Sequence, residues 1–470
     1  MKRALLAAAA VAAVAAAGLA WAALDGPIAE SLYRDGREGP LRIGHAWPGE
    51  PTVVLIVLDT VRSDHLSLCG YDRPTSPSLE ALRDRGAAWT CDALAPGSWT
   101  LPSHASYFTG LTPTEHGAHS LSAGGEALDL STSEQVRRLD AAHPTLAETL
   151  GARGYQSMAI SSNPVISGPS GLIRGFDDAV SGERFGQVTS PKLVFRLEAR
   201  LRRMMDRKTP LFLFLNFADA HQPWSGPRED WLKPRGELRL HASKEDGAWQ
   251  RWFRGEMLGT ERTRFLSHLT DAYDQGVLDA DAGVAKTIAL LEDMGWCRSG
   301  CRVVITSDHG EFLGEHDLLD HGHYLWQPDV QVPLVYWDSE GAAPELPSPV
   351  SALVAYHLAL DGRLPDPLPA VSSAAWPHVQ RAAWSGGRAF TETSAALWVG
   401  TEKLLWTDGE VARYDLADDP QELRPLPADD HRALPHLLEL AADVVASEEA
   451  GAGDLDPELT ELLKAAGYLE

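Results

Sequence analysis

The sequence predicts an α/β fold in which a large, mostly parallel sheet is sandwiched by helices, with a small C-terminal antiparallel sheet and a helical tail. Three observations support this prediction. Short runs rich in β-branched residues alternate with longer helical patterns, as is typical of a parallel sheet covered on both faces, and the pattern changes to Pro-rich, loop-like sequence after about residue 338. A chain of 470 residues with 44% hydrophobic content can bury such a core.

The chain opens with a leader-like segment over residues 1–24. Two basic residues precede an apolar run from Ala4 to Leu24, and Ala20 and Ala22 form a small-x-small cleavage pattern. This segment predicts a signal peptide or an N-terminal membrane anchor. We therefore expect an extracytoplasmic protein that is periplasmic, secreted or membrane-anchored.

Cysteine spacing and net charge indicate the redox compartment of the protein and exclude one class of partner. The four cysteines fit an oxidising compartment, and Cys297 and Cys301 are near enough in sequence to bridge across a turn. Spacing alone leaves a second bridge, between Cys69 and Cys91, open. The formal net charge of −25 argues against a nucleic-acid partner, whose phosphates need clustered Lys and Arg.

The main domain is expected over residues 50–370, a small β subdomain over 380–430 and an acidic helical tail over 431–470. Strands of the main sheet are predicted at residues 52–58, 155–160, 211–217 and 302–307. Helical patterns with cap signals at their ends occupy residues 76–86, 143–154 and 273–295. The segment "LWVGTEKLLWTDGEVARYDL" predicts two or three short strands with a turn at Asp408-Gly409.

Acidic and imidazole side chains follow three of the predicted strands. Asp59 comes after the first, Asp219 and His221 after the third, and Asp308 and His309 after the fourth. The carboxyl ends of parallel strands meet at one edge of a sheet, so these residues are expected to converge. Mixed carboxylate and imidazole ligands suit zinc or manganese.

The stretch "SWTLPSHASYFTG", residues 98–110, predicts a helix whose first turn carries a hydroxyl group. Pro102 suits the start of a helix, which places Thr100 at its mouth. There the backbone N–H groups and the helix dipole favour an alkoxide or a bound anion. Ser103, inside the first turn, is expected to bond to backbone groups instead.

Four segments resemble the sulfatase family of the alkaline phosphatase superfamily. They are "LDTVRSDHLSLCGYDRPTSPSLEALRDRGAAWTCDALAPGSWTLPSHASYFTG", "NFADAHQPW", "TSDHGEFLGEHDLLDHGHYLWQPDVQVPLVYW" and "RYDLADDPQEL". In the first, Thr100-Leu-Pro-Ser-His104 matches the family's nucleophile motif of Cys or Ser, any residue, Pro, Ser and Arg. The resemblance spans roughly residues 50–430 and implies a sulfatase-like catalytic domain. It also implies that Thr100 is the nucleophile, with His104 in place of the family's arginine.

The threonine departs from the family pattern in a way that changes the chemistry. Sulfatases of the well-known type oxidise a Cys or Ser to formylglycine, and threonine cannot give that aldehyde. Similarity to threonine-using relatives implies direct attack on a phosphoryl centre and a covalent phosphothreonine. Catalytic roles are expected for Thr100, His104, His221 and His323.

The metal ligands implied by the resemblance are Asp59, Thr100, Asp308 and His309. They match a one-metal site, for which zinc or manganese is expected and calcium is the alternative. A second ion is left open, held by Asp219 or His221 together with His321 or His323.

These residues predict an exported, metal-dependent hydrolase that cleaves a phosphate or sulfate ester through a covalent intermediate on Thr100. Two alternatives stay open: a transferase that passes the phospho-group to another acceptor, and a catalytically silent binding protein on the same scaffold. The expected substrate is a small-molecule, glycan-linked or lipid-linked anionic ester, with no nucleic-acid partner.

Overall fold

The computed structural model describes residues 49–121, 135–182, 188–204, 208–224, 247–322, 324–341, 343–376, 392–449 and 459. The expected leader, His323 and most of the chain beyond residue 449 lie outside these ranges. Among the described helices, none has the length and apolar character needed to span a membrane.

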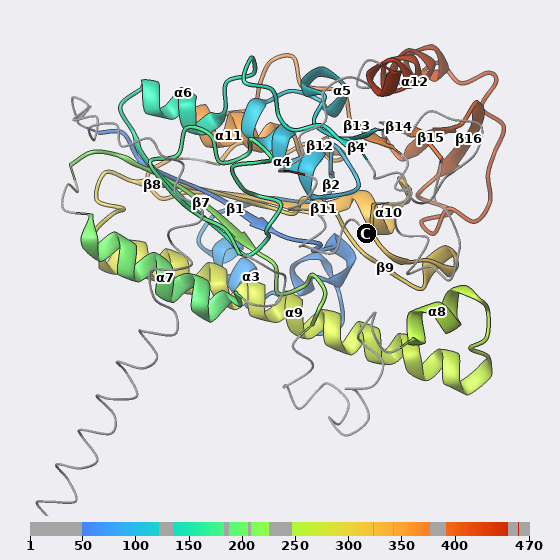
Figure 1. Cartoon of the computed structure of the whole chain (residues 1–470), viewed down its shortest axis with the longest axis horizontal. Helices are drawn as coiled ribbons and strands as arrows, with labels where there is room; N and C mark the ends of the chain where they lie inside the picture. The colour runs from blue at the N-terminus through green and yellow to red at the C-terminus, as the bar shows by residue number, and fades with distance from the viewer. Residues whose placement is uncertain are drawn as a thin grey trace, which may run out of the picture. The chain divides into compact units, whose positions relative to one another are not determined.

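An eight-stranded sheet forms the centre of the described structure (Figure 1). Its strand order is β12-β2-β11-β8-β1-β7-β5-β6, and all neighbouring pairs are parallel except the two made by β11. This confirms the predicted large, mostly parallel sheet. In chain order its strands are β1 (Thr52–Leu58), β2 (Ala88–Leu94), β5 (Gln156–Ser161), β6 (Asp178–Val180), β7 (Leu211–Phe217), β8 (Cys301–Thr306), β11 (Gln331–Asp338) and β12 (Val350–Ser351).

The four strands predicted from sequence are the central ones, β1, β5, β7 and β8. Every residue of β1 and β7 is buried, as expected for strands covered on both faces. Strands β2 and β11 were not predicted. The sequence of β2, "AWTCDAL", carries polar residues, and three of its positions are only partly buried, so it lacks a continuous apolar run.

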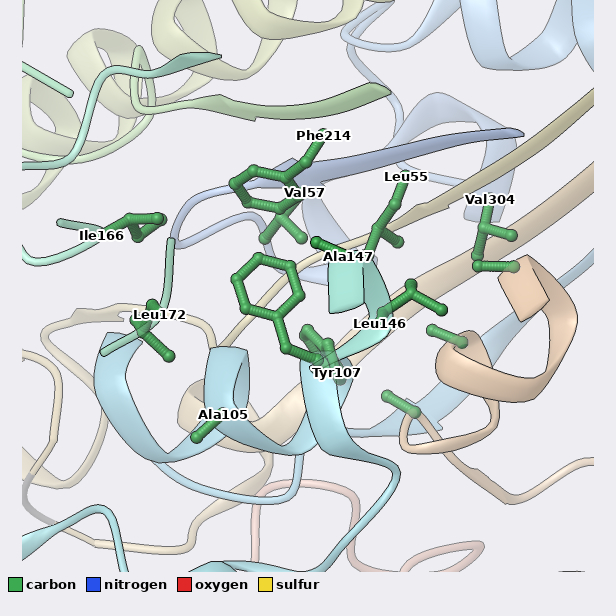
Figure 2. Close-up of a cluster of buried hydrophobic side chains, with 14 of the residues drawn as sticks. Leu55, Val57, Ala105, Tyr107, Leu146, Ala147, Ile166, Leu172, Phe214 and Val304 are labelled. Atoms are coloured by element: carbon green, nitrogen blue, oxygen red, sulfur yellow. The ribbon is translucent and has the colours of Figure 1, made fainter. Parts of the chain in front are cut away.

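Helices cover both faces of this sheet (Figure 1). On one face α4, α6 and α11 pack against alternate strand residues, and Figure 2 shows Leu55, Val57 and Phe214 of the strands on the side of the sheet that faces α4, the helix that carries Ala105 and Tyr107. On the other face α3, α7 and α9 pack against the intervening residues. The bounds are α3 (Pro77–Asp84), α4 (Thr100–Thr109), α6 (Leu146–Ala152), α7 (Ser190–Arg203), α9 (Gly259–Asp293) and α11 (Val354–Asp361).

Helix α9 begins at Gly259, well before the pattern at residue 273 from which it was predicted. A close backbone approach explains a glycine in its interior. A Cβ at Gly276 would lie 2.2 Å from the carbonyl oxygen of Asp219, so only glycine lets α9 pack directly against the loop after β7. This contact fixes the position of the loop after β7 relative to α9.

A second, four-stranded antiparallel sheet follows, as predicted, and helix α12 (Leu434–Glu449) packs on it. The sheet starts at Ser372, earlier than the expected residue 380. Lys403 of this sheet is fully buried, pairs with Glu422 and donates to the carbonyl of Leu325. The strands are β13 (Ser372–Ala375), β14 (Ser394–Val399), β15 (Glu402–Thr407) and β16 (Glu410–Asp415).

Two disulfides join the cysteines. Cys297–Cys301 bridges the turn before β8, as predicted, and Cys69–Cys91 ties the loop after β1 to β2. The shorter described elements are η1 (Ser63–His65), η2 (Ser67–Cys69), α5 (Pro113–His116), β3 (Ser120–Leu121), β4 (Gln135–Val136), α8 (Ala248–Phe253), β9 (Phe312–Leu313), η5 (Glu315–Asp317), β10 (Leu319–Asp320) and α10 (Gln327–Val330).

Candidate active site

The ends of β1 and β8 bring Asp59, Asp308 and His309 together. The two strands are parallel neighbours, so the residues that follow them lie at the same edge of the sheet. One ligand atom from each of the three side chains lies within 4.8 Å of the other two, and all three side chains are fully buried. The predicted convergence is therefore present in the structure.

The atoms that face one another in this group lack hydrogen-bond partners among the described residues. They are Asp59 Oδ1, Asp308 Oδ2 and His309 Nε2. His309 Nδ1 donates to the carbonyl of Gly310 at 2.9 Å, so Nε2 is the nitrogen that offers a lone pair when the ring gives up its second proton to a bound ion. Burying carboxylate oxygens and an imidazole nitrogen without hydrogen-bond partners costs free energy, and binding of a divalent cation by these atoms would offset that cost.

The backbone beside Asp59 is held in a strained conformation. Thr60 has φ of 62°, which is uncommon for a β-branched residue. Its N–H donates to Asp308 Oδ1 at 3.2 Å, and the N–H of Val61 donates to Ser307 Oγ at 2.9 Å. These bonds fix the turn after β1 against the end of β8, so the spacing of the two carboxylates is set by the backbone.

Thr100 is the first residue of α4 and is fully buried. Its Oγ1 accepts a hydrogen bond from Asn163 Nδ2 at 3.0 Å, and the same nitrogen donates to Asp59 Oδ2 at 2.7 Å. Asn216 donates to Asp59 Oδ2 as well, at 3.0 Å. One amide thus holds the threonine hydroxyl beside the carboxylate group, at the positive end of a helix dipole.

Without a bound ion, the pKa values of Asp59, Asp308 and His309 are set by burial and by the charges of the three side chains on one another. Burial raises the pKa of Asp59 to about 7, and the neighbouring Asp308 adds to the rise. Burial alone would raise the pKa of Asp308, but the charge of His309 lowers it to about 2. Burial would lower the pKa of His309, yet Asp308 raises it to about 9. The pair Asp308–His309 is therefore ionic, while Asp59 titrates near neutrality.

His104 lies beneath Thr100 on the same helix and is fully buried. Its Nδ1 donates to the carbonyl of Thr100 at 2.9 Å and lies 3.5 Å from Asp308 Oδ2. Burial lowers its pKa. A neutral imidazole in this position holds the first turn of α4 through the carbonyl of Thr100.

Ser103 has the role expected of it. Its Oγ donates to the carbonyl of Gly97 at 3.1 Å and accepts from the N–H of Gly97 at 3.3 Å. The serine therefore closes the turn before α4, and Thr100 is the hydroxyl that meets the carboxylates.

A second buried group of ligand-type side chains lies next to the first. It consists of Glu311, Asp320 and His321, with one ligand atom from each within 4.8 Å of the others. The ring of His321 lies 4.3 Å from that of His309 and 5.1 Å from that of His221, centroid to centroid. Of the residues named for a second ion, the structure thus brings His221 and His321 together, whereas His323 is outside the described ranges.

Asp219, which the sequence suggested as a ligand, bonds to the start of helix α7. Its carboxylate accepts the N–H of Ser190 at 3.1 Å and also the hydroxyl of Ser190, so it caps the first turn of α7. Its position after a strand predicted a ligand, but the described contacts of this carboxylate are with a helix end. Asp219 is also absent from both ligand groups found among the described residues.

Sequence reasoning missed Asn163, Asn216, Glu311 and Asp320. Asn163 follows β5 as Asp59 follows β1, so the rule applied to the other three strands also identifies it. Asn216 is the penultimate residue of β7 and pairs with Val57 of β1, which places it near the end of β1 where Asp59 follows. Glu311 and Asp320 depend on the β9–β10 hairpin, which no sequence pattern indicated.

Comparisons with known proteins identify the family and the fold. The family model described as Sulfatase matches residues 51–360. A putative sulfatase from Bacteroides thetaiotaomicron VPI-5482 is 16% identical with a TM-score of 0.59, over 87% of this chain and 96% of its own. The phosphonate monoester hydrolase of Agrobacterium radiobacter is 17% identical with a TM-score of 0.59, over 86% of this chain and 96% of its own.

A third solved structure, of a protein with D-glucosamine-2-N,6-O-disulfate as its substrate, is 16% identical with a TM-score of 0.60, over 87% of this chain and 99% of its own. At these identities the likeness to solved structures establishes the fold. The family model covers more than half of the chain and establishes the family. The chain belongs to the sulfatase family and is an ester-hydrolysing enzyme of that family.

Proposed function

We propose that this enzyme is an exported, metal-dependent hydrolase that cleaves a phosphate ester, with sulfate as the weaker substrate, through a covalent intermediate on Thr100. The observation that carries the proposal is the amide of Asn163. It donates to Thr100 Oγ1 and to Asp59 Oδ2 at once, so the hydroxyl lies beside the carboxylate and imidazole group.

The choice of phosphorus rests on the side chain of Thr100. Its hydroxyl carbon carries a methyl group, so oxidation would give a ketone and not the aldehyde of formylglycine. Without that aldehyde, release of a bound ester must occur by attack of water on the phosphorus or sulfur atom. A phosphothreonine can turn over in this way, which favours phosphate esters.

The residues fit a divalent cation, since three buried ligand atoms face one another without partners among the described residues. Asp59, Asp308, His309 and the oxygen of Thr100 would hold it, and the ligand types suit zinc or manganese. When bound, such an ion stabilises the alkoxide and the charge on the transferred group.

Separate side chains of the protein stabilise the attacking oxygen and protonate the leaving oxygen. Asn163 and the N-terminus of α4 stabilise the oxygen of Thr100 as it attacks, while His104 holds the carbonyl of Thr100 from below. The bond from Thr100 to phosphorus forms as the bond to the leaving oxygen breaks. We assign protonation of the leaving oxygen to His221, whose ring lies 5.1 Å from that of His321. The catalytic role expected for His323 rests on the sequence alone. Water then releases phosphate and restores the hydroxyl.

Export is proposed on two grounds. The leader over residues 1–24 has the pattern of a signal peptide or membrane anchor. Both cysteine pairs are disulfides, and no free cysteine is found in the structure. Structural disulfides persist in oxidising compartments. Recovery of residues 1–24 intact on a soluble cytosolic form would contradict export.

The test compares aryl phosphate monoesters, phosphodiesters and sulfates on purified protein. Thr100→Ala should lower turnover about a thousandfold or more, because both attack and ligation are lost, and Thr100→Ser should keep part of it. Thr109→Ala is the matched control on the same helix, since its hydroxyl bonds to the carbonyl of Ala105 at 2.7 Å, away from the ligand group.

Trapping of the intermediate identifies the nucleophile directly. A slow phosphate ester, an acid quench and peptide mass spectrometry should place a phospho-group on Thr100. Modification of Ser103 in its place, or full activity in Thr100→Ala, would refute the mechanism.

A further inference from the structure

We propose that two buried tyrosines, Tyr273 and Tyr107, are positioning residues for the ligand group of Asp59, Asp308 and His309. Their hydroxyl groups bond to the backbone of the two turns that carry these ligands. For its catalytic meaning the inference rests on the proposed function, while the positioning itself is tested by metal affinity and by the spectrum of a bound ion.

The turn after β1 has a conformation that its own sequence does not favour. The N–H of Val61 bonds to the carbonyl of Leu58 at 3.2 Å, so Asp59 and Thr60 are the two central residues of a β-turn. Thr60 has φ of 62° at the second central position, where a positive φ usually requires Gly or Asn. A β-branched residue keeps such a conformation only where surrounding contacts hold it.

Tyr273 supplies such a contact from helix α9. Its hydroxyl donates to the carbonyl of Thr60 at 2.7 Å and accepts the N–H of Arg62 at 2.9 Å, so one oxygen bonds to the backbone on both sides of Val61. The side chain is fully buried, and burial raises the pKa of Tyr273 well above its ordinary value. The hydroxyl therefore keeps its proton and remains a donor at neutral pH.

Tyr107 has the corresponding role at the turn after β8, from the opposite face of the sheet. Its hydroxyl donates to the carbonyl of Ser307 at 2.7 Å, directly before Asp308, and burial raises the pKa of Tyr107 well above its ordinary value. Tyr107 is also part of α4, about two turns after Thr100. The same bond therefore sets the position of the helix that carries the nucleophile against the turn that carries a ligand.

The two turns are bonded to each other, so the two tyrosines hold one unit. The N–H of Thr60 donates to Asp308 Oδ1 at 3.2 Å, and the N–H of Val61 donates to Ser307 Oγ at 2.9 Å. Ser307 Oγ in turn donates to the carbonyl of His309 at 2.7 Å. The ligands are part of these turns, so a shift of either turn changes the separation of the ligand atoms and with it the affinity for an ion.

Metal affinity tests the positioning without reference to activity. Tyr273→Phe and Tyr107→Phe each remove one hydroxyl and keep the ring in the core. Competition with a chromophoric chelator for Zn²⁺ should give each variant a Kd about tenfold higher than that of wild type. Tyr336→Phe is the matched control with the wild-type Kd, because this equally buried hydroxyl bonds to Asp338 and to the carbonyl of Gly362, on β11 and after α11.

A cobalt spectrum separates positioning from a general loss of stability. Co²⁺ replaces Zn²⁺ at carboxylate and imidazole ligands and absorbs visible light, with band positions that depend on the arrangement of the ligands. Wild type and Tyr336→Phe should give one spectrum, and Tyr273→Phe and Tyr107→Phe should give shifted ones. Denaturant unfolding of the metal-free proteins measures stability separately. A merely structural role would lower that stability and leave the Kd and the spectrum as in wild type.

Each tyrosine can be refuted by itself. A Kd or a cobalt spectrum equal to that of wild type in Tyr273→Phe or in Tyr107→Phe would overturn the assignment of that tyrosine and leave the proposed function standing. Failure of the wild-type protein to bind Zn²⁺ or Co²⁺ would overturn both this inference and the proposed function.

Discussion

Asp59 and Thr100 share one hydrogen-bond donor, the amide nitrogen of Asn163, at 2.7 and 3.0 Å. The carboxylate and the hydroxyl come from the ends of a strand and the start of a helix, and this single contact sets their separation. Asn216 donates to the same carboxylate oxygen from a neighbouring strand. Loss of Asn163 therefore affects both the hydroxyl and the carboxylate, whereas loss of Asn216 affects the carboxylate and breaks no described contact with the hydroxyl.

Replacement of Asn163 by alanine should lower kcat with the fold retained. A hydrogen bond to a charged group contributes about 1.5–3 kcal/mol, which corresponds to roughly a ten- to hundredfold loss when the charge is on the alkoxide of the transition state. Asn216→Ala is the control, since its side chain bonds to Asp59 and Ser161 and its described contacts do not include Thr100, so the change should affect metal affinity more than kcat. Equal kcat losses in the two variants would argue against a role for Asn163 at Thr100.

Metal removal should lower thermal stability in wild-type protein. An ion that binds only the native state stabilises it by about 2.7 kcal/mol at a hundred times its Kd. Asp308→Asn and His309→Ala should bind less metal, lose activity and show a smaller change in Tm upon addition of a chelator. Far-UV circular dichroism checks that their fold is intact. Unchanged metal stoichiometry in both variants would contradict the ligand assignment.

Metal binding should release protons, and the number should depend on pH. In the metal-free protein the pKa of Asp59 is raised to about 7 and that of His309 to about 9. Below pH 7 both groups hold a proton that must leave, so these two groups together should release about two protons near pH 6 and about one near pH 8, beyond the proton of the Thr100 hydroxyl. Affinity should accordingly rise with pH up to about 9. Calorimetry in buffers of different ionisation enthalpy measures this.

The two disulfides should contribute unequally to the free energy of unfolding. Cys69–Cys91 closes a separation of 22 residues and Cys297–Cys301 one of 4. The chain-entropy relation gives about 3 kcal/mol for the longer loop and about 2 kcal/mol for the shorter. Denaturant unfolding of the two paired Cys→Ala variants compares them, and a larger loss for the shorter loop would show that chain entropy does not dominate.

Site residues could be predicted from sequence where their position depends on the strand just before them, and not where it depends on packing between distant elements. Asp59, Asp308 and His309 could be predicted because they directly follow apolar runs, and parallel strands end at one edge. The same rule suggested Asp219 as a ligand, although its described contacts are with Ser190. That contact comes from the placement of α7 beside β7, which depends on tertiary packing and leaves no local pattern.

Two further differences have the same origin. The reversed direction of β11 depends on its neighbours β2 and β8, and a run of apolar residues does not specify which way it enters a sheet. Glu311 and Asp320 meet only because β9 and β10 are two-residue strands, too short to show an alternating pattern. The strand cores were predictable from composition, whereas the edges and hairpins required the assembled structure.

The buried ion pair of Lys403 and Glu422 lies outside the segment that the family model matches, residues 51–360, but it binds backbone groups inside that segment. The family match ends at residue 360, yet Glu422 also accepts the N–H of Gln327, within that match, at 2.7 Å. Lys403 donates to the carbonyl of Leu325 two residues earlier. Residues 325–327 closely follow the second ligand group, so the C-terminal sheet supplies part of the support on which that group rests. A chain cut at the end of the family match would leave these backbone groups without their acceptor and donor, and the catalytic machinery and its appendage are better regarded as one folding unit.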